Sequence, residues 1–241
     1  MHRALPAVAR RSLAFLFRCV TRTEVIFLTS LPGGGYIVAA NHISHFDPVI
    51  ISCQFPRYID WIAMEALFRG PLTNRLFDWL HAIPVARDGS DRSALRVACA
   101  RLAENRVVGI FPEAGIRAGP GSVLEGAPMW PGVAALSALA EKPVMPCVIL
   151  GSDRLYRPRA WLERPPVWRA FGRPVCPPPG TDRRTARNSV QDGLAKAFID
   201  LKEHLRRIYA LQPGDLPTTP QARKGEGRKA PSRDSWDVNK A

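Results

Sequence analysis

Apolar runs of strand length alternate with longer stretches of helical periodicity along most of this chain. The runs that predict strands are residues 25–29, 36–40, 58–63, 107–111 and 144–150. The stretches that predict helices are residues 65–81, 91–105, 131–141 and 189–210. This alternation predicts an α/β sandwich in which many of the strands pair in parallel.

Three other stretches lack this alternation. Residues 1–24 form a basic, amphipathic N-terminal segment, and residues 151–187, rich in proline and arginine, are expected to be irregular. From residue 211 onward the chain is polar, with proline, glycine and lysine, which predicts a disordered tail. We therefore expect one domain over residues 25–210, between the segment 1–24 and a basic tail over 211–241.

Length and composition indicate a globular protein. A chain of 241 residues with 46% hydrophobic content can bury one sizeable α/β core, or at most two small ones. No apolar run approaches the roughly 18 residues of a spanning helix, and the run 13–17 is too short for a signal peptide. The five cysteines lie far apart without a CxxC pair, which predicts buried, reduced thiols in a cytoplasmic protein.

The net charge of +13 is concentrated in residues 1–22, 153–187 and the tail, and the rest of the chain is neutral. Basic flanks indicate a partner with an anionic surface, either phospholipid or nucleic acid. Nucleic-acid motifs are missing, which favours an anionic phospholipid membrane surface and no nucleic acid. A helix over the N-terminal segment could lie in a membrane interface or pack on the core. Its apolar face would hold Leu13, Leu16, Phe17 and Val20, and another face Arg11, Arg18 and Arg22.

The most informative polar segment follows the expected strand 36–40 and reads Asn-His-Ile-Ser-His-Phe-Asp-Pro over residues 41–48. Asp47 and Pro48 predict a helix start, with Asp47 as N-cap and Pro48 at the first helical position. Strand-to-helix loops are common places for active sites in α/β folds. Because His42 and Asp47 are five residues apart, they act together only if His42 folds back over the helix start. A neutral histidine held by a carboxylate is the usual general base toward a hydroxyl.

These residues alone leave three interpretations open. Besides a catalytic pair, Asp47 could serve only as a helix cap and His42 only as a polar loop residue. His42, His45 and Asp47 could also bind a metal ion. No further cluster of histidine or cysteine completes a site of familiar spacing, so we expect no metal.

Charged residues end two further apolar runs. Arg87 stands just before the expected helix 91–105, where it could bind a phosphate together with free amides, or simply be solvated beside a turn. Glu113 and Arg117 follow the expected strand 107–111, and could pair with each other or contact ligand hydroxyls and phosphate. Gly115 would let the backbone approach a ligand closely. A separate strand at 144–150 has prolines that indicate a sheet edge or a tight bend at its start.

Taken in order, these blocks resemble the glycerolipid acyltransferases, most closely the bacterial 1-acylglycerol-3-phosphate (lysophosphatidic acid) acyltransferases. The resemblance covers about residues 25–155. The matching blocks are Asn41-His42 with Asp47, then Arg87, then Phe111-Pro112-Glu113 with Arg117, then Pro143-Val144-Met145-Pro146.

The resemblance implies transfer of an acyl group from acyl-CoA or acyl-carrier protein to the free hydroxyl of lysophosphatidate (1-acylglycerol 3-phosphate), which gives phosphatidate. It implies that His42 is the general base and that Asp47 orients it. It associates Arg87 with the acceptor phosphate and the block Phe111 to Glu113 with acceptor binding. It also implies an α/β domain with a membrane-associating N-terminal helix, a peripheral place on the inner face of the cell membrane, and no cofactor beyond the thioester co-substrate.

One departure from the family pattern concerns the third block, which most often reads Phe-Pro-Glu-Gly-Thr-Arg. Here Ala114 replaces the glycine, and Arg117 comes one residue later. The departure leaves open a different acceptor, such as glycerol 3-phosphate, another lysophospholipid or an acylated amino-acid lipid. A non-catalytic lipid-binding protein is the alternative from another class.

Overall fold

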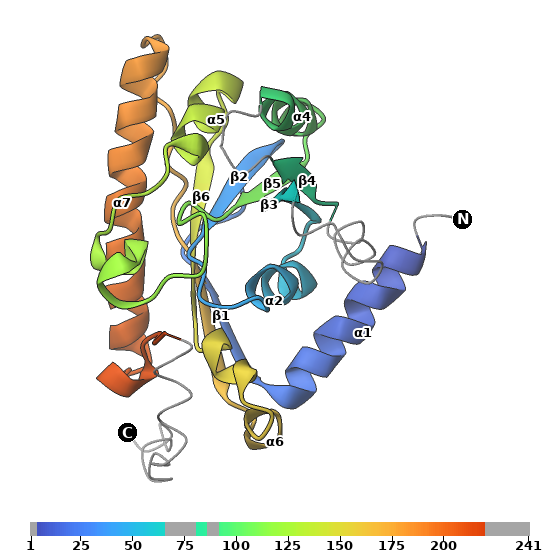
Figure 1. Cartoon of the computed structure of the whole chain (residues 1–241). Coiled ribbons are helices and arrows are strands. Elements are labelled where there is room, and N and C mark those ends of the chain that lie inside the picture. Colours follow the sequence, from blue (N-terminus) through green and yellow to red (C-terminus); the bar gives the residue numbers. More distant parts are fainter. Residues whose placement is uncertain (1–3, 66–80, 86–91, 220–241) are drawn as a thin grey trace.

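The fold is built around one mixed sheet in the computed structural model, which describes residues 4–65, 81–85 and 92–219 (Figure 1). The described strands are β1 Arg22–Phe27, β2 Tyr36–Ala40, β3 Ile59–Met64, β4 Ile83–Val85, β5 Val107–Ile110, β6 Val144–Leu150 and β7 Pro166–Phe171. Their order is β1-β7-β6-β2-β5-β3-β4, and only β6 and β7 pair antiparallel. The predicted α/β class with mostly parallel pairing is confirmed.

Helices cover both faces of this sheet, and Figure 1 places α5 and α7 on the side opposite α1 and α2. The described α-helices are α1 Ala4–Val20, α2 Asp47–Gln54, α4 Arg92–Ala103, α5 Gly132–Ala140, α6 Ala160–Glu163 and α7 Arg183–Ile208. The short 3-10 turns are η2 Gly119–Gly121, η3 Val123–Glu125, η4 Ser152–Tyr156 and η5 Pro213–Asp215.

The central strand β2 divides the core into two layers. Ile37 and Ala39 belong to the layer beneath α4, α5 and α7, whereas Tyr36, Val38 and Ala40 belong to the layer beneath α1 and α2. Successive side chains of a strand point to opposite faces, so an all-apolar strand needs cover on both sides. This explains why the run 36–40 shows no alternation of polar and apolar residues.

Most sequence-based predictions of strands are confirmed. The short strand β4 was not predicted, and three further differences concern β1, β7 and β6. The first strand, expected at 25–29, lies at Arg22–Phe27, because pairing with β7 extends it into the polar residues Arg22 to Glu24. Residues 151–187, expected to be irregular, contain the fully buried strand β7. Its apolar run is interrupted by Arg169, whose buried guanidinium donates to the Ile50 carbonyl and the Gln54 side chain.

The third difference is that β6 lies between β2 and β7 and is therefore not at a sheet edge. Pro146 is tolerated there because its nitrogen faces the β7 side before the β6–β7 ladder begins at Cys147. The Pro146 carbonyl still accepts a hydrogen bond from the N–H of Gly172, 2.9 Å away. A missing donor at this position therefore breaks no pairing.

The N-terminal helix packs one face on the core and exposes another. Phe17 is buried, and Leu13 and Val20 pack against the layer beneath α2. Phe15 and Leu16 remain 71% and 42% exposed. The predicted apolar face is thus divided between the core and the surface. None of the described helices is long and apolar enough to cross a membrane.

Helix boundaries differ from prediction where apolar periodicity is absent. The last helix begins at Arg183, six residues before the expected start, because Asp182 caps it by accepting from the N–H groups of Arg184 and Thr185. The predicted helix 65–81 lies largely outside the described residues, as do Arg87 and the start of the predicted helix 91–105.

The predicted burial of all cysteines is wrong for Cys19 and Cys176, which are exposed free thiols.

The division into segments 1–24, 25–210 and 211–241 stays a prediction. β1 crosses the first of these boundaries, because it begins at Arg22. Beyond the second boundary, Leu211 is buried and Asp215 forms an ion pair of 2.8 Å with Arg154.

Gly109 of β5 sets the position of Trp61, and we expect Gly109→Ala to destabilise the fold. An added Cβ would lie 2.5 Å from the Trp61 ring and 2.6 Å from Ile59 in a packed layer. Overpacking of this kind costs about 1–3 kcal/mol, which would lower the unfolding midpoint in a thermal melt. Gly121→Ala is the control, because its added Cβ meets open space; equal melting temperatures for both variants would contradict the prediction.

Candidate active site

The loop after β2 brings His42 back over the start of α2, as the sequence predicted. Phe46 is the N-cap residue, and Asp47 and Pro48 are the first two helical residues, so the prediction of Asp47 as N-cap is wrong. The reason is that the Asp47 carboxylate does not reach forward into its own helix. It accepts hydrogen bonds from the loop residues that precede it.

The Asp47 carboxylate is fully buried and accepts hydrogen bonds from several donors. Oδ2 accepts from the N–H groups of Ile43 (2.7 Å) and Ser44 (2.8 Å) and contacts Nδ1 of His42 at 2.9 Å. Oδ1 accepts from the hydroxyls of Ser44 (3.1 Å) and Ser152 (2.5 Å). An ionised carboxylate can accept this many hydrogen bonds, and these bonds compensate for its removal from water.

His42 is held on four sides. Its backbone N–H donates to Oε2 of Glu113 at 2.5 Å, and its carbonyl accepts from the N–H of Arg117 at 2.8 Å. Nδ1 faces Asp47, and the ring stacks on Phe111 with centroids 4.1 Å apart. A proton on Nδ1 directed at the carboxylate leaves Nε2 with a free lone pair. The His42 side chain is 17% exposed.

The stack continues beneath His42. Phe111 stacks on Trp61 with centroids 4.5 Å apart and an interplanar angle of 8°. The Trp61 indole N–H donates to the Ser52 hydroxyl of α2 at 2.8 Å. The rings therefore connect the loop that carries His42 to the helix that begins with Asp47.

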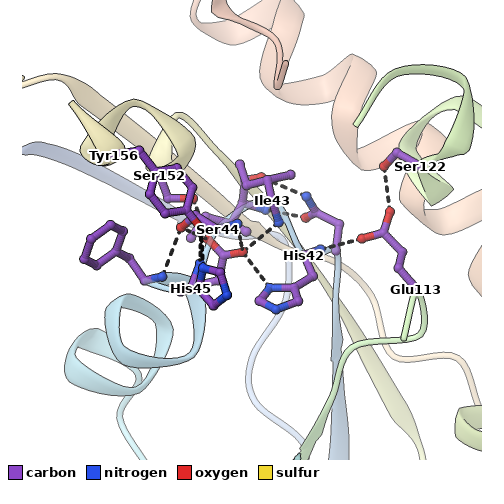
Figure 2. A network of polar contacts seen from close by, with 12 residues as sticks. His42, Ile43, Ser44, His45, Glu113, Ser122, Ser152 and Tyr156 are labelled. Carbon is purple, nitrogen blue, oxygen red and sulfur yellow. Dashed lines mark hydrogen bonds and ion pairs between the residues drawn. The ribbon is translucent and has the colours of Figure 1, made fainter. Parts of the chain in front are cut away.

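Glu113 follows the neighbouring strand β5 and contacts the His42 loop from that side. Its Oε1 accepts from the Ser122 hydroxyl at 2.7 Å and from the Val123 N–H at 2.9 Å. Burial raises the pKa of this carboxyl, whereas the hydrogen bonds from Ser122, His42 and Val123 oppose that shift. Figure 2 shows Glu113 and Ser122 on one side of His42, and Ser44 and Ser152 on the other. His42 is thus held by Glu113, which follows β5, and through Asp47 by Ser152, which follows β6.

The remaining predicted residues differ in their surroundings. Arg117 is exposed, and among the described residues it forms no ion pair with Glu113 or another carboxylate. Pro112 is buried, and its carbonyl accepts from the Trp130 N–H at 2.9 Å. A Cβ on Gly115 would meet open space. The role of these residues in binding stays a prediction. So does that of Arg87, which lies outside the described residues.

Ala114 takes the left-handed conformation that glycine favours, with φ of 51°. It stands where the commonest family block has glycine, so here an L-residue carries the strain of a conformation that glycine adopts freely.

His45 bonds Tyr156 and not the His42–Asp47 pair. Its Nδ1 contacts the hydroxyl of Tyr156 at 2.5 Å, and its N–H donates to the same oxygen at 2.9 Å. Among the described residues no three histidine, cysteine or acidic side chains gather as metal ligands. Cys53 is buried, and burial raises the pKa of its thiol to about 11, so it is a poor nucleophile at neutral pH.

Sequence reasoning missed Ser152, Tyr156 and Ser122. Ser152 follows Gly151, which has φ of 86° and whose added Cβ would lie 2.3 Å from the Pro166 carbonyl. The pair Gly151-Ser152 at the end of the apolar run 144–150 is the signal that could have indicated a third functional strand end.

Comparison with known proteins identifies the class. A family model described as Acyltransferase matches residues 22–150, more than half of the chain, so the chain belongs to the acyltransferase family. Its fold is similar to the crystal structure of the 1-acyl-sn-glycerophosphate (LPA) acyltransferase PlsC from Thermotoga maritima. That match has a TM-score of 0.58 and 20% identity, and covers 84% of this chain and 83% of the other. No curated protein sequence matches the chain. The predicted family resemblance is confirmed.

We expect Ser152→Ala to slow turnover without weakening substrate binding. Loss of one hydrogen bond to a buried carboxylate costs about 1.5–3 kcal/mol, and it loosens the hold on Asp47 Oδ1 and, through Asp47, on His42. The expected result is a fall in kcat of about 10-fold or more with KM unchanged. Ser137→Ala is the control, since Ser137 is a buried serine of α5 that donates to the Lys142 carbonyl just after that helix. A rise in KM alone would contradict this role.

We expect Ala114→Gly to stabilise the protein. A left-handed alanine costs about 1–2 kcal/mol, and the extra freedom of an unfolded glycine offsets about 0.5–1 kcal/mol of that gain. Thermal melts should show a small rise in the unfolding midpoint. Ala118→Gly in the same loop should lower it, because Ala118 has φ of −152° and carries no such strain. The opposite ranking would argue against strain at Ala114.

Proposed function

We propose that the protein transfers a fatty acyl group from a thioester, acyl-CoA or acyl-carrier protein, to the free hydroxyl of 1-acylglycerol 3-phosphate, giving phosphatidate. The observation that carries this proposal is the contact of 2.9 Å between His42 Nδ1 and a buried Asp47 that is saturated with donors. The pair stands at the carboxyl end of β2 within an acyltransferase fold.

The proposed step is direct transfer. Nε2 of His42 takes the proton of the acceptor hydroxyl as its oxygen attacks the thioester carbonyl. The carbon–sulfur bond breaks, the new ester bond remains, and the imidazolium returns the proton to the leaving thiolate. Asp47 stays ionised and stabilises the imidazolium. General-base assistance of this kind contributes about 10²–10⁴ in rate. The step needs no metal, and the acceptor itself is the nucleophile.

Acceptor binding is proposed for the strand ends around this pair. The family resemblance associates Arg87 with the acceptor phosphate and the block Phe111 to Glu113 with the acceptor. Arg117 is exposed, and its backbone N–H donates to the His42 carbonyl, so its Cα lies close to the His42 loop. An exposed guanidinium there favours an anionic acceptor.

A peripheral position on the inner face of the cell membrane is also proposed. On α1, the apolar Phe15 and Leu16 are exposed beside the exposed Arg11 and Arg18. The adjacent helix α6 adds Leu162, which is 88% exposed. Apolar side chains flanked by arginine suit an interface with anionic lipid headgroups.

A different anionic acceptor is the second candidate. Ala114 and the later Arg117 depart from the commonest family block, and Arg117 is free among the described residues. Glycerol 3-phosphate, another lysophospholipid or an acylated amino-acid lipid would then replace lysophosphatidate at the same site.

The test is thiol release from oleoyl-CoA or oleoyl-acyl-carrier protein in mixed micelles, with and without lysophosphatidate. We expect release that requires the acceptor and falls by at least about 10²-fold in His42→Ala. His45→Ala is the matched control, because His45 bonds Tyr156 and not Asp47. Activity that survives in His42→Ala would refute the mechanism, and turnover with only another acceptor would select the second candidate. Lipid binding without any release would indicate a non-catalytic protein.

A further inference from the structure

The backbone of His42 lies beyond the sheet, because the pairing of β2 with its neighbours has already ended. Backbone pairing with β5 ends at Ala39, and that with β6 ends at Asn41. The N–H of His42 instead donates to Oε2 of Glu113 at 2.5 Å. A side chain therefore takes the place of a neighbouring strand at the residue that carries the proposed base.

Both oxygens of the Glu113 carboxylate are occupied by donors of the protein itself. Glu113 is 4% exposed, and its Oε1 accepts from the Ser122 hydroxyl at 2.7 Å and from the Val123 N–H at 2.9 Å. A carboxylate offers about four lone-pair sites, and three hydrogen bonds already use them. The bond from Ser122 also opposes the rise in the pKa of Glu113 that burial causes. It thereby favours the ionised form, which accepts all three bonds.

Ser122 is itself held by a turn that is anchored in the core. It is the N-cap residue of η3, and its oxygen accepts from the Leu124 N–H at 3.2 Å, so its proton is directed at Glu113. Leu124 is buried in the layer beneath α4, α5 and α7. At the other end of the turn, Glu125 forms an ion pair of 3.1 Å with Lys202 of α7. The Ser122 hydroxyl is therefore placed by the core and by a helix on the sheet face opposite α2.

Figure 2 shows two pairs of a serine and a carboxylate, one on each side of His42. Ser152 donates to Asp47, which contacts the ring nitrogen Nδ1. Ser122 donates to Glu113, which accepts from the backbone N–H. The first pair sets the direction of the ring, and the second sets the place of the backbone that carries it. A general base needs both, because it must lie within hydrogen-bond distance of the proton that it removes.

We propose that Ser122 is a positioning residue for the acyl transfer, which acts through the Glu113 carboxylate on the backbone of His42. This inference rests on the proposed function and adds a residue outside the blocks that carry the family resemblance. It also means that the Glu113 carboxylate serves His42 and not the acceptor hydroxyl.

The first test is a double-mutant cycle of Ser122→Ala and Glu113→Gln on acyl transfer to lysophosphatidate. We expect Ser122→Ala to lower kcat about tenfold, with KM for the acceptor unchanged within about twofold, because a displaced base impairs the chemical step and not binding. In the Glu113→Gln background the same substitution should change kcat less than about twofold, because the link through the carboxylate is already lost. Ser137→Ala, at a buried serine of α5, is the control and should leave both constants unchanged.

Two kinetic outcomes would overturn the inference. A rise in KM with kcat unchanged would assign Ser122 and Glu113 to acceptor binding. Full additivity of the two substitutions would show that Ser122 acts independently of Glu113.

Amide hydrogen exchange tests the hold on His42 without any need for turnover. A bonded amide exchanges only when its hydrogen bond opens, so Ser122→Ala should speed exchange of the His42 N–H about fivefold or more, and Ser137→Ala should not. Equal exchange in Ser122→Ala and wild type would refute the inference and leave the proposed function standing. Absence of acyl transfer to any acceptor by the wild type would refute the proposed function. The exchange result would then still decide whether Ser122 holds the His42 backbone.

Discussion

The site depends on one buried charge, the Asp47 carboxylate. A buried carboxylate without partners costs several kcal/mol, so the surrounding chain must supply donors or the helix start cannot form. The donors come from the loop before α2 and from Ser152 after β6. Because the backbone N–H groups among them are fixed, the carboxylate has one orientation, and its remaining contact orients His42. The hydrogen bonds that compensate for burial of the Asp47 carboxylate therefore also set the orientation of His42.

The sheet topology brings these groups together. β6, β2 and β5 are neighbours in that order, and each carries one part of the site just after its last residue. Ser152 follows β6, His42 follows β2, and Glu113 follows β5. The three strands are parallel, so their carboxyl ends share one edge. The side chain of Asn41 extends this order, because it donates to and accepts from the backbone of Ile149 beyond the β2 ladder.

Sequence patterns predicted what is local and missed what depends on pairing. The run 36–40 and the His42–Asp47 pair were predictable, because an apolar run and a helix start can be recognised without knowledge of neighbours. β7 was missed because Arg169 interrupts its run, and only the α2 groups that accept from its guanidinium permit its burial. Ser152 was missed because its partner lies 105 residues away. Its role follows from the neighbourhood of β6 and β2, which no spacing in the sequence reveals.

Charge illustrates the same limit, since the net charge of a segment does not say which of its charges are free. Among the arginines of residues 153–187, Arg169 is buried, and burial lowers its pKa to about 10. Arg154 is paired with Asp215, and Arg164 donates to the Arg18 carbonyl. Those at the start of α7 keep an unpaired charge among the described residues, on the face away from α1. The exposed arginines of α1 and those at the start of α7 therefore belong to helices on opposite faces of the sheet.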